Sequence, residues 1–207
     1  MWDVRATFLP RMPSKALDYW KTTSQLQLNE FEDVHKKVGG TGRGRRYLTE
    51  QLNRSYLVAV SAQFQRFCRD LHTEAAQRIV ETVKPELRLV VMKLFTNNRK
   101  LDTGNANEAN LGPDFGRLGM KFFPAVDASH RRNKDRRLVL KQLNAWRNAV
   151  VHEDFDFNQE DQQAVKNSKP VLRFVRAWRK NCNELALEFD KVVRAYTSAV
   201  VGGVPWE

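Results

Sequence analysis

The chain has 207 residues, of which 42% are hydrophobic and 29% are charged. This length and composition predict a single globular domain over residues 1–207 with a sizeable core. It has two cysteines and no run of about 18 apolar residues, which argues against a disulfide framework and a membrane span. The net charge of +11 at pH 7 favours nucleic acid or an acidic protein as partner; a basic surface that only aids solubility is the alternative.

The cysteines and histidines do not form a metal-binding pattern. Cys68 and Cys182 fall on apolar helical positions, where a free cysteine acts as a small hydrophobic residue. We expect His35 to be a hydrogen-bonded core residue, and His72 and His130 to lie at the surface. No pair of histidines has the spacing of metal ligands, so neither a metal nor another cofactor is expected. The first residues lack the regions of a signal peptide, which makes the cytoplasm the expected location.

The hydrophobic pattern is helical along the chain and predicts an all-α fold, an antiparallel helical bundle with long second and last helices. Ser14 is a suitable N-cap for the first helix and Asn158 for a short late helix, and Pro85 breaks the chain after the long second helix. In chain order we expect helices over 14–38, 47–83, 86–95, 128–152, 159–167 and 170–200.

Three segments are predicted to lie outside helices. The basic loop over 39–46 lacks the final Lys-Ser/Thr of a P-loop, which argues against nucleotide hydrolysis there. The stretch over 97–123 is rich in Asn, Gly and Asp, and predicts a long loop with a short turn near Asp114. Two glycines end the last helix, and we expect residues 202–207 to form a short flexible tail.

The last helix has apolar residues at alternating spacings of three and four, which is a heptad seam. Packing within the bundle of one chain is the favoured explanation, and pairing with another chain is the alternative. The seam consists of Val171, Val175, Trp178, Cys182, Leu185, Phe189, Val192 and Tyr196.

The helix over 128–152 ends in Arg147-Asn148-Ala149-Val150-Val151-His152. Arg147 falls inside the apolar arc of a helical wheel, so it requires either an internal partner or a phosphate in a groove. Asn148 lies one turn before His152 and could orient the imidazole; the alternatives are a solvated amide and a histidine that only caps the helix end. A cation for phosphate and a group that transfers protons near neutral pH are what metal-free RNA cleavage requires.

A polar stripe runs along the same helix, beside the apolar arc, and ends at His152. We expect Arg137, Lys141 and Asn144 in this stripe to bind substrate, with the two cations following the RNA backbone. Solvated charge is the alternative explanation for such cations. Trp146 is assigned to the core rather than to base stacking.

The segment Arg147–His152 resembles the Arg-x4-6-His motif of the HEPN superfamily, in which Asn commonly follows the arginine, as Asn148 does here. The motif also has a similar position, late in a helix that one more long helix follows. The earlier long helix is similar too, with Arg45-Arg46 and the run Ala59–Phe64. The resemblance covers most of the chain in the order of its helices, and the short motif is its specific part.

This resemblance implies a metal-independent endoribonuclease built as an α-helical bundle that dimerises, so that two motifs meet in one cleft. Because this chain has one motif, a homodimer is implied. His152 would act as general base or acid, Arg147 would stabilise charge at the phosphate, and Asn148 would orient or bind. Attack by the 2′-oxygen would leave a 2′,3′-cyclic phosphate. An acidic residue in an early helix supports the site in some members, and the candidates are Glu30, Glu32 and Asp33.

The implied biological role is that of a toxin or antiviral defence effector that cuts RNA, with an acidic antitoxin protein as a candidate partner. The alternative is a non-catalytic HEPN module that binds RNA, a nucleotide or an acidic partner protein in the same cleft.

Overall fold

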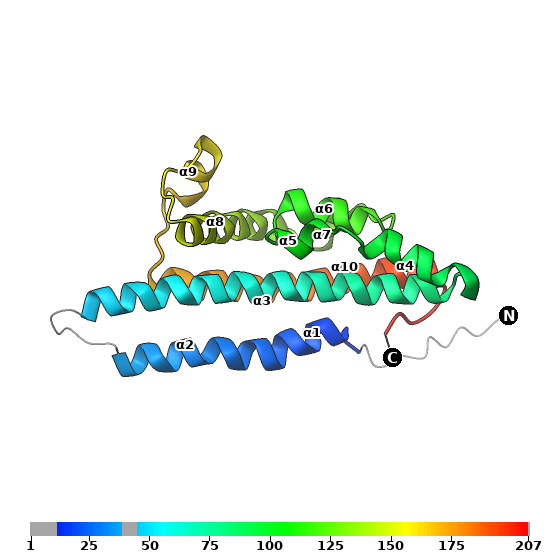
Figure 1. The fold of residues 1–207 in the computed structure, drawn as a ribbon, viewed down its shortest axis with the longest axis horizontal. Helices are drawn as coiled ribbons and strands as arrows, with labels where there is room; N and C mark the ends of the chain where they lie inside the picture. Colours follow the sequence, from blue (N-terminus) through cyan, green and yellow to red (C-terminus); the bar gives the residue numbers. More distant parts are fainter. Residues whose placement is uncertain (1–11, 39–44, 207) are drawn as a thin grey trace.

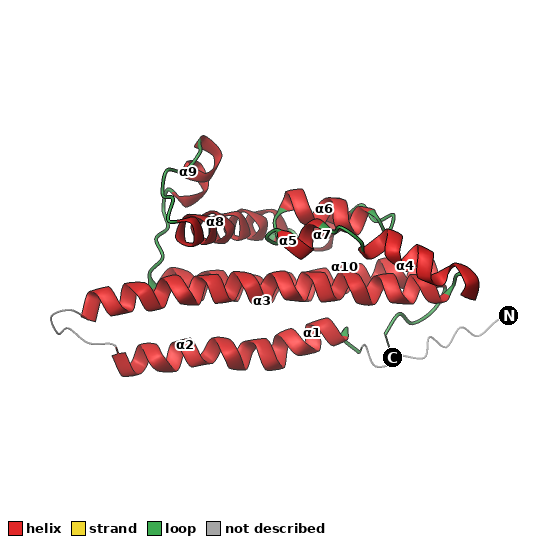
Figure 2. Ribbon diagram, in the orientation of Figure 1, coloured by secondary structure: helices red, strands yellow, loops and turns green. Residues whose placement is uncertain are grey.

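The computed structural model describes residues 12–38 and 45–206, and its regular elements in these ranges are helices, which confirms the all-α fold (Figures 1 and 2). Helices α3 (Arg45–Glu81) and α10 (Leu172–Val201) pack along each other and form the long axis. The predicted loop over 39–46 falls mainly on 39–44, outside the described residues. The other elements are α1 (Lys15–Tyr19), η1 (Trp20–Ser24), α2 (Gln25–Val38), η2 (Pro85–Leu87), α4 (Arg88–Thr96), α5 (Lys100–Thr103), α6 (Glu108–Gly116), α7 (Phe122–Ser129), α8 (Asn133–His152) and α9 (Gln159–Val165).

The first predicted helix is confirmed as the continuous run α1–η1–α2, which covers one side of α3. The hydroxyl of Ser14 accepts a hydrogen bond from the Leu17 N–H at 3.0 Å, as expected of an N-cap. The Ser14 N–H in turn donates to the buried Asp190 carboxylate of α10 at 3.0 Å, which ties the start of this helix to the last one. Between α1 and α2, η1 is a single π-helical turn.

Large aromatic side chains form the centre of the core. Phe64 of α3 contacts Trp20 and Phe189, with ring centroids 5.7 and 5.9 Å apart. Phe122 of α7 stacks on Phe115 at 4.3 Å and meets Phe189 edge-on at 4.9 Å. All five side chains are buried. Each removes a large apolar area from water, so the cluster joins η1, α3, α6, α7 and α10.

The heptad seam of α10 packs within the chain, as the sequence analysis favoured. Its members from Val175 to Val192 are buried, so they do not offer a free surface to another chain. Val171, just before the helix, is 40% exposed. Near the other end, the Tyr196 hydroxyl donates to the Leu118 carbonyl at 2.6 Å.

The end of the chain differs from the predicted flexible tail. Gly202 ends α10 in the left-handed conformation, with φ +71°, which a glycine adopts without strain. Trp206, however, is only 4% exposed and belongs to the core cluster. Burial of the apolar indole of Trp206 stabilises the packing of this segment on the bundle, because it removes a large apolar area from water.

The segment over 97–123 is not the long loop that was predicted. Helices α5 and α6 form within it, and the Asn107 side chain caps α6. The fully buried carboxylate of Asp114 accepts hydrogen bonds from the backbone N–H groups of Lys100 at 3.0 Å and Leu101 at 2.8 Å, which ties α5 to α6. Helices this short have too few turns to show an apolar periodicity, which explains the wrong prediction.

His72 of α3 is fully buried, so its predicted place at the surface is wrong. Its Nε2–H donates to the Asp114 carbonyl at 2.9 Å, and its Nδ1 accepts from the Arg99 guanidinium at 3.3 Å. Burial lowers the pKa of His72 to about 4, and the nearby Arg99 charge acts in the same direction. The imidazole is therefore neutral at pH 7 and joins α3 to the segment that carries α5 and α6.

The predicted motif helix over 128–152 is divided in two. Residues up to Ser129 belong to α7, the backbone is extended at His130, and α8 begins at Asn133. The buried Asn133 amide donates to the Val126 carbonyl at 2.6 Å, which fixes the corner between the two helices. After α8, the short helix α9 is capped by Asn158, as predicted.

Helix α4 has an exposed apolar face at the end of the bundle opposite α9 (Figure 1). Leu87, just before it, is 51% exposed, and Val90 and Leu94 are 56% and 68% exposed. None of the helices in 12–38 and 45–206 combines the length and apolarity needed to cross a bilayer.

Candidate active site

The Arg147–His152 motif occupies the last two turns of α8, which packs against α3, α9 and α10. The helix ends there because Glu153 adopts the left-handed conformation, with φ +53°. The N–H groups of Glu153 and Asp154 both bond back to the Ala149 carbonyl, which closes the helix end. His152 is therefore the last helical residue, at an open edge of the bundle.

The buried face of α8 is rotated from the predicted one. A helical wheel places Leu140, Leu143 and Val151 together in the apolar arc; Leu140 and Leu143 are buried, but Val151 is 45% exposed. Asn144, expected to bind substrate, is buried instead: its amide donates to the Ala106 carbonyl at 3.0 Å. An amide can be buried at little cost when its hydrogen bonds are made, and this one holds the 104–107 segment against α8.

The side chain of Asn148 accepts hydrogen bonds from Arg147 and from Asn105, a residue that sequence reasoning missed. The Asn148 Oδ1 accepts hydrogen bonds from the Asn105 Nδ2 at 2.7 Å and the Arg147 Nη1 at 3.1 Å. Asn105 is 7% exposed, so its amide is fixed by the surrounding chain. Arg147 is half-buried, and the exposed amide of Asn148 is its hydrogen-bond partner. The Asn-rich segment over 105–110 was the available signal for such a contact.

His152 is exposed, and in the described parts of the chain its imidazole has no hydrogen bond or ion pair. Phe155, three residues later, is 43% exposed, so apolar surface adjoins the histidine. An accessible imidazole can accept or donate a proton at a ligand, and the neighbouring guanidinium can bind a phosphate. The two side chains do not contact each other directly among the described residues, so a complete catalytic set needs a further group.

Arg137 and Lys141 are engaged by carboxylates. Arg137 binds Glu108 at 2.7 Å and Asp127 at 2.5 Å, and its guanidinium lies over the Phe123 ring at 4.4 Å. The Lys141 ammonium binds Glu160 at 2.9 Å, which raises the Lys141 pKa. Arg137 with Glu108 and Lys141 with Glu160 line a cavity of about 480 Å³, and Asn144 and Asn148 line it too. The predicted track for an RNA backbone is therefore neutralised along this groove.

The three acidic candidates lie on α2, across α3 from α8 (Figure 1). Glu32 binds the Arg176 guanidinium and accepts from the Tyr56 hydroxyl, and Arg176 lowers the pKa of the Glu32 carboxyl. Asp33 binds Lys36 on its own helix at 2.8 Å, and Glu30 is exposed. The structure does not bring any of the three to the motif.

Comparison of the chain with protein-family models, with curated proteins and with solved structures found no match. The resemblance to the HEPN superfamily thus rests on the motif and its place in the helix order.

The contact between Asn105 and Asn148 yields a test of how the motif is held. In an Asn105→Asp variant, a carboxylate oxygen would face the Asn148 Oδ1 instead of a donor. We expect the free energy of unfolding to fall by about 1–3 kcal/mol, the range for a buried polar group left without its partner. Urea unfolding followed by circular dichroism measures this change.

Asn107→Asp provides the matched control, because Asn107 caps α6 and aspartate caps a helix equally well. Equal urea midpoints for the two variants would show that the Asn105 contact does not stabilise the motif segment.

Proposed function

We propose that this protein is a metal-independent endoribonuclease that acts as a homodimer, with Arg147, Asn148 and His152 of two copies in one cleft. The main support is the arrangement at the end of α8. Asn148 is held by Asn105 and Arg147, and an unpaired, exposed His152 lies one turn beyond it. The net charge of +11 also suits a polyanionic substrate.

The dimer follows from what one chain lacks. One copy supplies a single imidazole, whereas in-line cleavage of RNA needs one group to remove a proton and another to deliver one. Val151, which precedes His152, is 45% exposed, so the edge that carries the motif has apolar surface for a second copy to cover.

In the proposed reaction, His152 of one copy takes the proton of the ribose 2′-hydroxyl. The 2′-oxygen forms a bond to the adjacent phosphorus, and the bond from phosphorus to the 5′-oxygen breaks. His152 of the second copy protonates that leaving oxygen, giving a 2′,3′-cyclic phosphate and a 5′-hydroxyl. Arg147 stabilises the charge that develops on the phosphate oxygens, and Asn148 orients Arg147. By family resemblance, the proposal extends to a cytoplasmic toxin or defence effector that an acidic antitoxin restrains.

The proposal is tested with a labelled single-stranded RNA incubated with the purified protein in excess chelator. Cleavage should persist, the 5′ products should carry a 2′,3′-cyclic phosphate by mass spectrometry, and a 2′-deoxy substitution at the cut position should abolish cleavage there. Light scattering during size-exclusion chromatography should give the mass of two chains. A monomer without activity, or cleavage that the 2′-deoxy substitution leaves intact, would contradict this mechanism.

A second candidate function is a non-catalytic module that binds RNA, a nucleotide or an acidic protein in the same cleft. The side chains of Arg147 and His152 do not contact each other within the described residues, which favours this candidate because a binding module needs no paired groups for proton transfer. Binding of RNA with an unchanged product ladder would support this candidate over the enzyme.

A further inference from the structure

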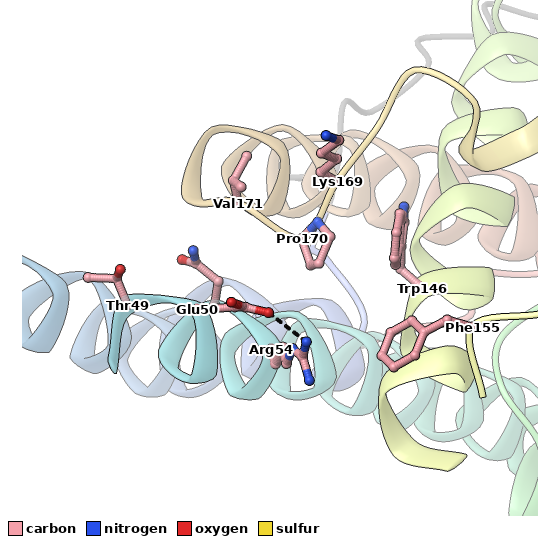
Figure 3. A pocket seen from close by; sticks show the side chains of 9 residues that line it. Thr49, Glu50, Arg54, Trp146, Phe155, Lys169, Pro170 and Val171 are labelled. Atoms are coloured by element: carbon pink, nitrogen blue, oxygen red, sulfur yellow. Dashed lines mark hydrogen bonds and ion pairs between the residues drawn. The ribbon is translucent and has the colours of Figure 1, made fainter. Parts of the chain in front are cut away.

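A cavity of about 510 Å³ opens where α3, the end of α8 and the segment before α10 meet (Figure 3). It lies on a different side of α8 from the groove of Arg137 and Lys141. Trp146 and Phe155 line one side, and Pro170 and Val171 line the other. A volume of this size is within the range of small-molecule sites, and its walls are mainly apolar.

The orientation of the Trp146 ring in the cavity wall is fixed by contacts with residues outside the cavity lining. The Trp146 indole N–H donates to the buried Ser168 hydroxyl at 2.9 Å, and the Phe157 ring packs edge-on against the indole at 5.1 Å. Phe155 has the Arg54 guanidinium 5.4 Å from its ring centroid, yet remains 43% exposed. A fixed indole next to an exposed phenyl ring is a surface on which another flat ring can stack. Trp146, assigned to the core from sequence, is thus also a wall of an open site.

The charges around the cavity favour a negatively charged ligand. Glu50 and Arg54 form an ion pair at 2.6 Å, so they cancel each other. Lys169 is exposed, and its ammonium group has no hydrogen bond or ion pair within the described ranges, so its charge is the uncompensated one among the three. A flat ring joined to a nearby anion is the chemistry of a nucleotide.

We propose that this cavity binds one nucleotide, with its base against Phe155 and Trp146 and its phosphate at Lys169. The nucleotide can belong to an RNA strand, and in that case the inference rests on the proposed function and extends it. Because Phe155 follows His152 by three residues, the cavity would hold the nucleotide next to the cleaved bond. It can also be a free nucleotide. The chemistry of recognition is the same, and the experiment separates the two sources.

The experiment measures binding of a fluorescein-labelled 12-nucleotide RNA by anisotropy, in a His152→Ala background that prevents cleavage. Phe155→Ala should weaken binding by about 5- to 100-fold, which corresponds to the loss of one stacked base. Lys169→Ala should lower the slope of log affinity against log salt by about 0.7, the value for one phosphate contact on a single strand. Both side chains are exposed, so unchanged circular dichroism and melting are expected.

Lys93→Ala and Leu94→Ala are the matched controls, because both residues are exposed on α4 at the other end of the bundle. They should bind like the parent. Adenosine and uridine monophosphates are added as competitors: displacement of the RNA identifies the free nucleotide as sufficient, and no displacement identifies the strand as the ligand.

The inference is overturned if Phe155→Ala and Lys169→Ala both bind as the parent does, or if neither RNA nor nucleotide binds at physiological salt. Its failure differs from that of the proposed function. If binding depends on Phe155 but the wild-type protein does not cut RNA, the proposed nuclease activity is contradicted and the proposed nucleotide site is supported. If the protein cuts RNA but Phe155→Ala does not change RNA binding, only the proposed nucleotide site is contradicted.

Discussion

Replacement of His152 with alanine is expected to lower the rate of RNA cleavage by about 10²- to 10⁴-fold, the usual contribution of a general acid or base. His152 is exposed at the end of α8, so the substitution removes no packing from the core. We therefore expect wild-type stability, an unchanged molecular mass in solution and retained RNA binding. The measurement is the initial rate of cleavage of a labelled RNA in chelator.

His130→Ala is the matched control for this loss. His130 is a half-exposed histidine that lies just before the first residue of α8, at the opposite end of that helix from His152. It should cleave at the wild-type rate. If the His152→Ala and wild-type proteins cleave equally fast, the imidazole takes no part in the reaction, and any residual nuclease must act elsewhere.

Stability should depend strongly on pH between about 4 and 6.5 because of the buried His72. The pKa of His72 is about 4 in the folded chain, and an unperturbed histidine has a pKa of about 6.5. In this window the unfolded chain binds a proton that the folded chain does not. The free energy of unfolding should thus fall as the pH decreases from 7 toward 4, by about 3 kcal/mol from this group, and its contribution should be constant above pH 7.

Urea unfolding at several pH values, compared between the wild type and His72→Gln, isolates this effect. A glutamine amide can still donate toward the Asp114 carbonyl but does not titrate. Carboxylates with lowered pKa, such as those of Glu32 and Glu160, change stability in both proteins at lower pH and cancel in the difference. Identical pH profiles would show that His72 is not buried as a neutral imidazole.

Much of the fold follows from hydrophobic periodicity and capping chemistry. The seam of α10, the length of α3 and the caps at Ser14 and Asn158 were all predicted, because each depends on neighbours within a few turns of one helix. The segment over 97–123 was missed because tertiary contacts hold it: the buried Asp114 carboxylate bonds to backbone N–H groups 13 and 14 residues earlier.

The candidate site divides in the same way. The order of Arg147, Asn148 and His152 on one helix is local, and so was predictable. The partner of Asn148 is Asn105, 43 residues away in sequence, and no spacing rule connects them. Asn144 was assigned to the polar stripe by its angle on the helical wheel, at the border of the apolar arc, whereas the Ala106 carbonyl allows its amide to be buried.

The π-helical turn η1 has a consequence for variation in chain length. Such a turn has one residue more than the α-helical turn that it replaces, and the helices on either side keep their own registers. Deletion of one exposed residue there, such as Thr22, would convert the wide turn into an ordinary one and leave Leu17 and Leu28 facing α3. Elsewhere in the long helices, a deletion would rotate every later side chain by about 100° away from its contacts. Natural or engineered single-residue gaps in the first helix should therefore cluster at this turn.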